Sequence, residues 1–219
     1  MVRIIRFELF KTVRENVLKI CIIIALLVTI VMLSGTDITI ESFVQRSFLV
    51  SIIASLYAAF YASKDFEGGK ILYPVLSGNS RIEIVTAKLI AVFIGTEILN
   101  LIFPITVFCF CPEWDISLKI RILFAYVLLG SILAVIGELL AWILKKQGVT
   151  VLATIICHIG SLLLMNGENT FKITMHIIPI GIVKLWLDGE FQIIYGITFC
   201  IWFVVPFIAT MIIAQHSEM

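Results

Sequence analysis

The chain has 219 residues, of which 61% are hydrophobic and 14% are charged, and its formal net charge is +1. A soluble domain is usually about 45–50% apolar and about 25% charged, so a water-exposed exterior is excluded and the chain is predicted to be an integral membrane protein. The near-zero net charge gives no indication of a nucleic-acid partner.

An amphipathic helix is predicted first, over residues 2–16, because cations alternate there with apolar residues at roughly helical spacing. Such a helix lies on the membrane surface, with its cations toward anionic lipid headgroups. The cations are Arg3, Arg6, Lys11 and Arg14. A cleaved signal peptide is the alternative, with residues 33–35 as the cleavage site, but its positively charged region would be unusually long.

Six apolar runs follow, each with about the 20 residues that a helix needs to cross a bilayer. They occupy residues 17–33, 43–62, 84–108, 120–144, 149–165 and 191–213. Pro179 and Gly181 interrupt the mixed segment 166–190 before the last run, and we predict short broken helices there, at the outer face. We therefore expect an all-α integral membrane protein with six transmembrane helices, in which residues 1–219 form a single transmembrane domain.

The distribution of Lys and Arg predicts the orientation of the spans. If the N-terminus is cytoplasmic, eleven of these cations lie on the inner side of the membrane and five on the outer side. We therefore predict a multi-pass protein of the plasma membrane with both termini in the cytoplasm. In this orientation the segment 63–83 is a cytoplasmic loop.

The stretch 63–88 is the part of the chain best able to contact a soluble partner, because it is charged and lies between two membrane-length runs. Its charged residues are Lys64, Asp65, Glu67, Lys70, Arg81, Glu83 and Lys88. The string Gly68-Gly69-Lys70 lacks the first Gly and the hydroxyl residue of a P-loop, so we do not expect this chain to bind ATP in that way. The sequence also lacks the motifs H-E-x-x-H and G-x-S-x-G. We therefore expect a non-catalytic chain without a metal or cofactor of its own.

Three polar residues within the spans are candidates for a substrate path. Glu97 and Asn100 share one helix face because they are three positions apart. Glu97 lies ~20 Å from the cytoplasmic end of its span and Glu138 ~9 Å from the end of its own, which argues against a paired-carboxylate site. A charge at the centre of a span costs about 2.5–3.5 kcal/mol on insertion scales. The alternative is that these residues are interhelical hydrogen-bond partners, with Glu97 in its protonated form.

A stripe of small residues on the fourth span permits close helix packing, either within the bundle or between subunits. The stripe consists of Gly130, Ala134, Gly137 and Ala141. The three histidines are scattered, and His158, inside a span, is interpreted as a packed or hydrogen-bonded residue. The five cysteines form no disulfide or metal framework.

One pattern in the charged stretch is more specific than its composition. An acidic residue, Glu-Gly, a short apolar run, Ser-Arg and a later Lys follow one another, here as Asp65, Glu67, Gly68, Ser80, Arg81 and Lys88. The pattern resembles the cytoplasmic loop of type-2 ATP-binding-cassette (ABC) permeases, and the six spans, amphipathic first helix and broken outer segment are similar too. The chain departs from the family at Gly69-Lys70, where a small hydroxyl residue commonly follows the first Gly, and at Gly78, where Pro is frequent.

The resemblance implies that this loop forms a coupling helix that docks on a separate ATPase subunit, where ATP and Mg bind. The residues expected to couple the two subunits are Asp65, Glu67, Gly68, Gly69, Lys70, Ser80 and Arg81. Asp65 and Glu67 would present carboxylates to the ATPase. Ser80 has a structural alternative, because it could cap the third span with Glu83 completing a capping box. Arg81 could likewise be an anchor that flanks the membrane.

The function implied by the resemblance is that of the membrane subunit of a bacterial ABC exporter, which moves a peptide, drug or lipid-like amphipathic substrate. The layout is most similar to that of immunity exporters for antimicrobial peptides such as lantibiotics and bacitracin. Pairing with a second copy or a sister permease is also implied. The alternatives are an ion-coupled carrier, with Glu97 as the proton site, and a non-transporting membrane sensor or assembly partner.

Overall fold

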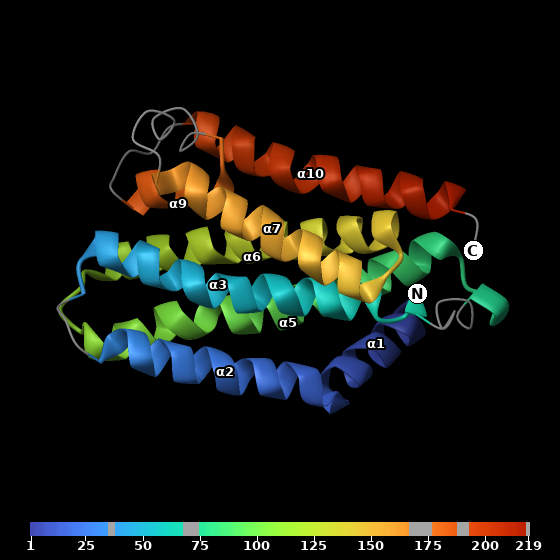
Figure 1. Cartoon of the computed structure of the whole chain (residues 1–219), viewed down its shortest axis with the longest axis horizontal. Helices are drawn as coiled ribbons and strands as arrows, with labels where there is room; N and C mark the ends of the chain where they lie inside the picture. Colours follow the sequence, from blue (N-terminus) through green and yellow to red (C-terminus); the bar gives the residue numbers. More distant parts are fainter. Residues whose placement is uncertain (35–37, 68–74, 167–176, 188–192, 218–219) are drawn as a thin grey trace.

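The computed structural model describes residues 1–34, 38–67, 75–166, 177–187 and 193–217, and the regular secondary structure in these ranges is helical. The helices are α1 (Val2–Arg14), α2 (Asn16–Leu33), α3 (Ile40–Ser63), α5 (Arg81–Phe110), α6 (Ile116–Leu144), α7 (Gln147–Asn166), α9 (Pro179–Leu187) and α10 (Ile193–His216) (Figure 1). The predicted all-α fold is therefore confirmed.

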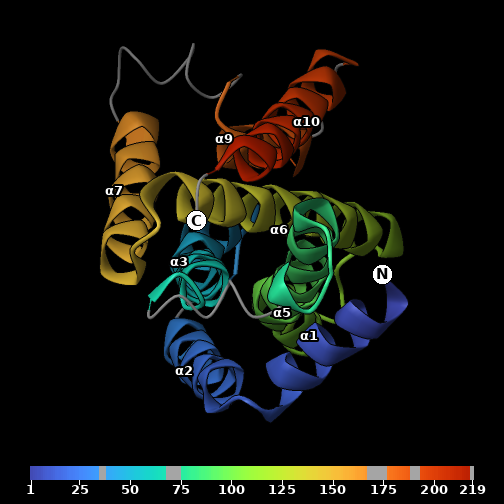
Figure 2. The same ribbon diagram turned by 90° about the vertical axis from the view of Figure 1, so that its right-hand side faces the viewer.

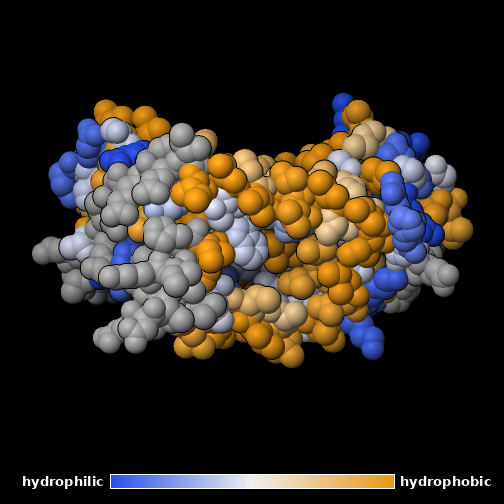
Figure 3. All heavy atoms as spheres, turned by 90° about the horizontal axis from the view of Figure 1, so that it is seen from above, coloured by the Kyte–Doolittle hydropathy of each residue, from blue (hydrophilic) through white to orange (hydrophobic). Residues whose placement is uncertain are grey.

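Five helices, α2, α3, α5, α6 and α10, are long and apolar enough to cross a membrane. They coincide with five of the six predicted spans. The remaining predicted span, residues 149–165, lies within α7, a helix of 20 residues. Apolar side chains form a broad band between two polar ends on the face seen in Figure 3. These features are those of a multi-pass helical membrane protein.

Both termini lie at one end of the bundle, which we call the terminal end (Figure 1). There α1 packs across α5, while α3, α5 and α6 pack against one another at the centre of the bundle. Figure 2 shows α10 above α6, and α7 packs beside both α3 and α6. The short helix α9 lies at the end opposite the termini, within the predicted broken segment 166–190. Residues 167–176 and 188–190 of that segment lie outside the described part of the chain.

Local sequence explains several helix boundaries. The backbone of Glu15 is extended, with ψ of 138°, and this residue separates α1 from α2. At the start of α5, the Glu83 amide donates to the Ser80 hydroxyl oxygen and the Ser80 amide donates to the Glu83 carboxylate, so the predicted capping box is confirmed. Lys145 adopts a left-handed conformation, with φ of 51°, that ends α6 before α7 begins.

Small residues allow the central helices to approach closely. A Cβ atom added to Gly137 on α6 would lie 2.9 Å from Ala58 Cβ and 3.1 Å from the Ala58 carbonyl carbon on α3. A Cβ atom added to Gly130 would lie 2.6 Å from a carboxyl oxygen of Glu97 on α5. Ala134 and Ala141 are fully buried. The small-residue stripe therefore packs within the bundle, which was one of its two predicted roles.

Candidate functional site

Charged side chains from separate helices meet at the terminal end. Lys11 Nζ, on α1, lies 2.8 and 2.9 Å from the two carboxylate oxygens of Asp65, which follows α3. Lys88 Nζ, on α5, lies 3.1 Å from Asp65 Oδ2, and Glu8 Oε2 lies 4.0 Å from Lys11 Nζ. We call Glu8, Lys11, Asp65 and Lys88 the charge cluster. It joins α1, α5 and the end of α3 at one point.

Three members of the charge cluster are buried: Lys88 is 1% exposed, Glu8 3% and Asp65 9%. Further hydrogen bonds satisfy them. Lys88 donates to the Ala62 carbonyl oxygen at 3.0 Å, and the Tyr61 hydroxyl donates to Glu8 Oε2 at 3.1 Å. Buried charges need such partners because they have lost their hydration. The contacts between α1, α3 and α5 are therefore both electrostatic and geometrically specific.

The two lysines determine the ionisation of Asp65. Burial by itself would raise the pKa of Asp65, but the attraction of Lys88 and Lys11 outweighs burial and lowers the pKa to about 2. The neighbouring Lys64 shows the opposite balance, since burial lowers its pKa to about 8 despite its ion pair with Glu15. Asp65 is therefore ionised at neutral pH and can act as a permanent counter-ion.

The structure revises the predicted role of Asp65. We expected its carboxylate to face an ATPase, but it faces into the bundle because Lys88, almost fully buried, requires a counter-ion. Glu67 is exposed two residues later, and its carboxylate is accessible to a partner. Three other predicted coupling residues lie outside the described part of the chain, namely Gly68, Gly69 and Lys70.

Arg81 contacts the end of α10. Its Nη1 atom donates to the Gln215 carbonyl oxygen at 3.1 Å and also to the Ser217 carbonyl oxygen. The last carbonyl groups of a helix lack intrahelical donors, so a cation at this position satisfies them. Ser80 caps α5, as its structural alternative predicted. Arg81 and Ser80 therefore have roles within the bundle that differ from the predicted docking role.

Glu97 and Asn100 both face α6, in agreement with their predicted shared face. Asn100 Nδ2 donates to the Tyr126 carbonyl oxygen at 2.7 Å, as an interhelical hydrogen-bond partner would. Glu97 is 9% exposed, and neither of its carboxyl oxygens has a hydrogen-bond partner among the described residues. The nearby Ser131 hydroxyl donates instead to a carbonyl of its own helix at 2.8 Å. Burying a carboxyl group without a hydrogen-bond partner is energetically unfavourable. Glu97 therefore remains a candidate functional residue.

Glu138 lies in a different environment, closer to the terminal end. It is fully buried, and its Oε1 accepts a hydrogen bond from Trp142 Nε1 at 3.0 Å. Gly130, which contacts Glu97, is eight residues earlier on α6, so ~12 Å separates the two positions along the helix. This separation agrees with the prediction that Glu97 and Glu138 are not a carboxylate pair.

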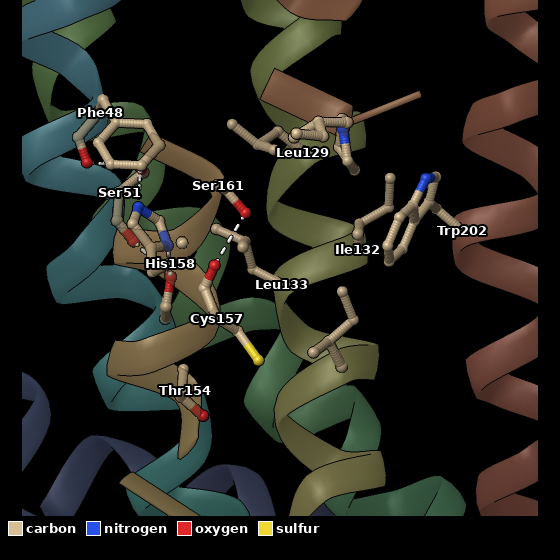
Figure 4. A pocket seen from close by; sticks show the side chains of 15 residues that line it. Phe48, Ser51, Leu129, Ile132, Leu133, Thr154, Cys157, His158, Ser161 and Trp202 are labelled. Carbon is tan, nitrogen blue, oxygen red and sulfur yellow. Dashed lines mark hydrogen bonds between the residues drawn. The ribbon is translucent and has the colours of Figure 1, made fainter. Parts of the chain in front are cut away.

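A cavity of about 470 Å³ lies among α3, α6, α7, α9 and α10, and we call it the His158 pocket. His158 of α7 contacts two serines of α3: its Nδ1 lies 3.0 Å from Ser55 Oγ and its Nε2 lies 3.3 Å from Ser51 Oγ. Figure 4 shows these side chains on one side of the cavity and Trp202, with leucine and isoleucine side chains of α6, on the other. The pocket therefore has a polar side and an apolar side.

The sequence did not reveal the His158 pocket, because His158 was interpreted as a packed residue. Ser51 and Ser55 are four positions apart and therefore share a face of α3. This spacing is the one feature of the sequence that indicates a polar patch there. Their partner is more than 100 residues away, so only the packing of α7 on α3 brings the three side chains together. Within the described ranges, no group of three or more His, Cys, Asp or Glu residues could hold a metal ion.

A scan against protein-family models found no matching family, and a search of curated proteins found no matching relative. Function is therefore inferred from the charge cluster, the exposed Glu67 and the His158 pocket, together with the resemblance of the stretch 63–88.

Acid should remove the contribution of Asp65 to stability. Its pKa is about 2 in the fold against an ordinary value of 3.8, so the contribution is complete above about pH 4 and is lost as the pH falls through about 2. In detergent micelles, the difference in unfolding temperature between wild type and Asp65→Asn should therefore shrink between about pH 4 and pH 2. Glu113→Gln, at an exposed carboxylate, should show no such convergence. A difference that stays constant across this range would contradict the ion pairing.

Proposed function

We propose that this chain is the membrane-spanning subunit of a bacterial ABC exporter, which moves a peptide, drug or lipid-like amphipathic substrate. A separate subunit would bind ATP with Mg and hydrolyse it. The observation that supports this proposal best is the pairing of Asp65 with both Lys11 and Lys88. Asp65 lies near the start of the charged segment 63–83, which we place in the cytoplasm. A force on that segment would therefore reach α1, α3 and α5 together.

The same ion pairs give the family resemblance a physical basis. The pattern begins with an acidic residue and ends with a lysine, and here Asp65 and Lys88 lie 3.1 Å apart. The two ends of the segment cannot separate without leaving a buried charge unpaired, which is strongly unfavourable. Because an ion pair holds the two ends of the segment together, a displacement of the segment would move the attached helices with it. The ATPase must also contact the segment differently in its two nucleotide states, because only differential contacts shift an equilibrium.

Partners and location follow from the same proposal. We propose that Glu67 contacts the ATPase, that the terminal end faces the cytoplasm of a bacterium, and that the chain pairs with a second copy or a sister permease. Basic side chains at the terminal end support this orientation. They include Arg3, Lys11, Lys64, Arg81, Lys88 and Lys145. Among known groups, the immunity exporters for antimicrobial peptides have the most similar layout.

Co-purification tests the proposal. The tagged full-length chain, co-expressed with the ABC ATPase encoded nearest to it, should retain that ATPase in a stoichiometric complex. Glu67→Lys should reduce the retained ATPase at least ~10-fold, because reversing one exposed charge at a contact removes an attraction and adds a repulsion. The matched control is Glu113→Lys, an exposed carboxylate at the other end of the bundle, which should leave the complex intact.

Two results would overturn this function. The first is that no ATPase is retained by the wild-type chain. The second is that Glu67→Lys leaves both the complex and ATP-driven transport unchanged, which would show that Glu67 does not couple the subunits.

An ion-coupled carrier is the second candidate, and the buried carboxyl group of Glu97 favours it. Both carboxyl oxygens lack hydrogen-bond partners within the described ranges, as a proton-carrying group between two states would. If the chain is an ion-coupled carrier, transport into proteoliposomes should continue without ATP and should stop when the proton gradient is dissipated. Glu97→Gln should also abolish that transport. Transport that requires ATP and survives Glu97→Gln would exclude the carrier.

A further inference from the structure

The polar side of the His158 pocket offers hydrogen-bond acceptors. A hydroxyl group has one proton to donate, and each hydroxyl on this side already donates it to a backbone carbonyl of its own helix. The donor–acceptor distances are 2.7 Å for Ser51, 2.7 Å for Ser55, 2.9 Å for Thr154 and 2.8 Å for Ser161. The hydroxyl oxygens therefore keep lone pairs but no proton for a bound molecule.

His158 adds two ring nitrogens to the polar side, each within hydrogen-bonding distance of a serine oxygen. A neutral imidazole donates from one nitrogen and accepts at the other. The shorter contact, 3.0 Å from Nδ1 to Ser55 Oγ, is assigned to the N–H donor because the Ser55 proton is already used. The other ring nitrogen, Nε2, then accepts, and it lies 3.3 Å from Ser51 Oγ, whose proton also faces the Phe48 carbonyl oxygen. Ser51, Ser55 and His158 are buried. Because the serine protons are used within the protein, the remaining lone pairs of the serine oxygens favour a ligand that donates hydrogen bonds.

The other side of the pocket is apolar and faces the polar side across the cavity (Figure 4). It is lined by Leu129, Ile132, Leu133, Ile136 and Trp202. The volume, about 470 Å³, falls in the range of roughly 300–1,000 Å³ that is usual for small-molecule sites. Cys157, on the α7 side, is exposed, so the pocket can be reached from outside the bundle.

We propose that the His158 pocket binds a single-chain amphiphile whose polar end donates hydrogen bonds, as a long-chain alcohol or amine does. The polar end would donate to the serine oxygens beside His158, and the alkyl chain would lie along α6 and α10. An ionised carboxylate has no proton to give and should be rejected. As a statement about substrate class this inference rests on the proposed exporter function, but the binding itself needs no ATPase.

Fluorescence quenching tests this binding on the full-length chain in lipid nanodiscs, without an ATPase. The probes are 11-bromoundecan-1-ol and 11-bromoundecanoic acid at about pH 8, which differ only at the polar end and carry a bromine that quenches tryptophan. At equal membrane concentrations, the alcohol should quench Trp202 saturably. The carboxylate should bind at least ~10-fold more weakly, which corresponds to about one lost hydrogen bond. Trp202→Phe should remove the saturable component.

Variants then locate the polar end of the probe. Ser55→Ala and His158→Leu should each weaken binding of the alcohol ~5–10-fold. Thr198→Ala is the matched control, since the Thr198 hydroxyl also donates to a carbonyl of its own helix, at 2.9 Å, but does not line the pocket. If His158→Leu does not fold, a variant with Cys157 as its single cysteine replaces it, and bound alcohol should slow alkylation of Cys157 by N-ethylmaleimide.

Four outcomes would overturn the inference: binding of neither probe, equal binding of the two probes, tighter binding of the carboxylate, or binding that Ser55→Ala leaves unchanged. Failure of ATPase co-purification would overturn the proposed exporter function and would leave this binding site intact. Conversely, failure of the probes to bind would contradict the proposed substrate class and would leave intact the proposal that the chain couples to an ATPase.

Discussion

Replacing Asp65 with asparagine should lower the free energy of unfolding by about 3–5 kcal/mol, the usual cost of removing one partner from a buried ion pair. The substitution preserves the size of the side chain. It leaves Lys88, which is 1% exposed, without the carboxylate that lies 3.1 Å from its ammonium group, and it removes the main counter-ion of Lys11 as well. Unfolding by heat or denaturant in detergent micelles at neutral pH measures this change.

Two comparisons separate ion pairing from the loss of a charged side chain. Glu67→Gln alters an exposed carboxylate two residues away and should change stability by less than ~0.5 kcal/mol. Lys88→Met should cost less than Asp65→Asn, because Asp65 keeps its contact with Lys11. The double variant should cost less than the sum of its parts, since the second change removes the charge that the first one left unpaired. Strictly additive costs would show that the two side chains do not interact.

Gly137→Val should destabilise the bundle by about 1–3 kcal/mol, as overpacking of a close-packed core does. An added Cβ atom would lie 2.9 Å from Ala58 Cβ and 3.1 Å from the Ala58 carbonyl carbon. A backbone carbon cannot rotate out of the way, so α3 would have to move away from α6. Because α3 carries Ser51 and Ser55, the same substitution should weaken binding to the His158 pocket. Unfolding and the quenching assay measure the two effects separately.

The matched control for Gly137→Val is a glycine on α10. A Cβ atom added to Gly196 meets no atom within 4 Å, so Gly196→Ala should be neutral or stabilising by up to ~1 kcal/mol through the higher helix propensity of alanine. Gly95→Ala differs from both, because the added Cβ atom would lie 2.3 Å from the ring of a side chain, Tyr57. If Gly137→Val and Gly196→Ala have the same free energy of unfolding, the inference that α3 and α6 pack closely at Gly137 is wrong.

Features that depend on neighbouring residues were accessible from the sequence. The apolar runs predicted the long helices because about 20 apolar residues suffice to define a span. The capping box at Ser80 and Glu83 was predictable because its two members are three positions apart. Likewise, the spacing of Glu97 and Asn100 predicted that they share a face, and both do face α6.

Features that depend on which helices are neighbours could not be predicted from the sequence. Nothing in the charged stretch indicates that Asp65 turns inward, because one of its cations lies on α1 and the other on α5. Arg81 was expected at the membrane surface or at a docking site, and its acceptors proved to be the carbonyl groups at the end of α10. The pairing of His158 with Ser51 and Ser55 likewise requires knowledge that α7 packs on α3.

The contact between Arg81 and α10 has a consequence for the order of assembly. Arg81 and Gln215 are 134 residues apart, and α5 is synthesised long before α10. The start of α5 can therefore be capped by Ser80 at an early stage, but its link to α10 cannot exist until that helix has been made and inserted. The charge cluster, whose members lie on α1, α5 and the end of α3, can form before α10 is made, so the contact of Arg81 with α10 is added to an end of the bundle that is already held together.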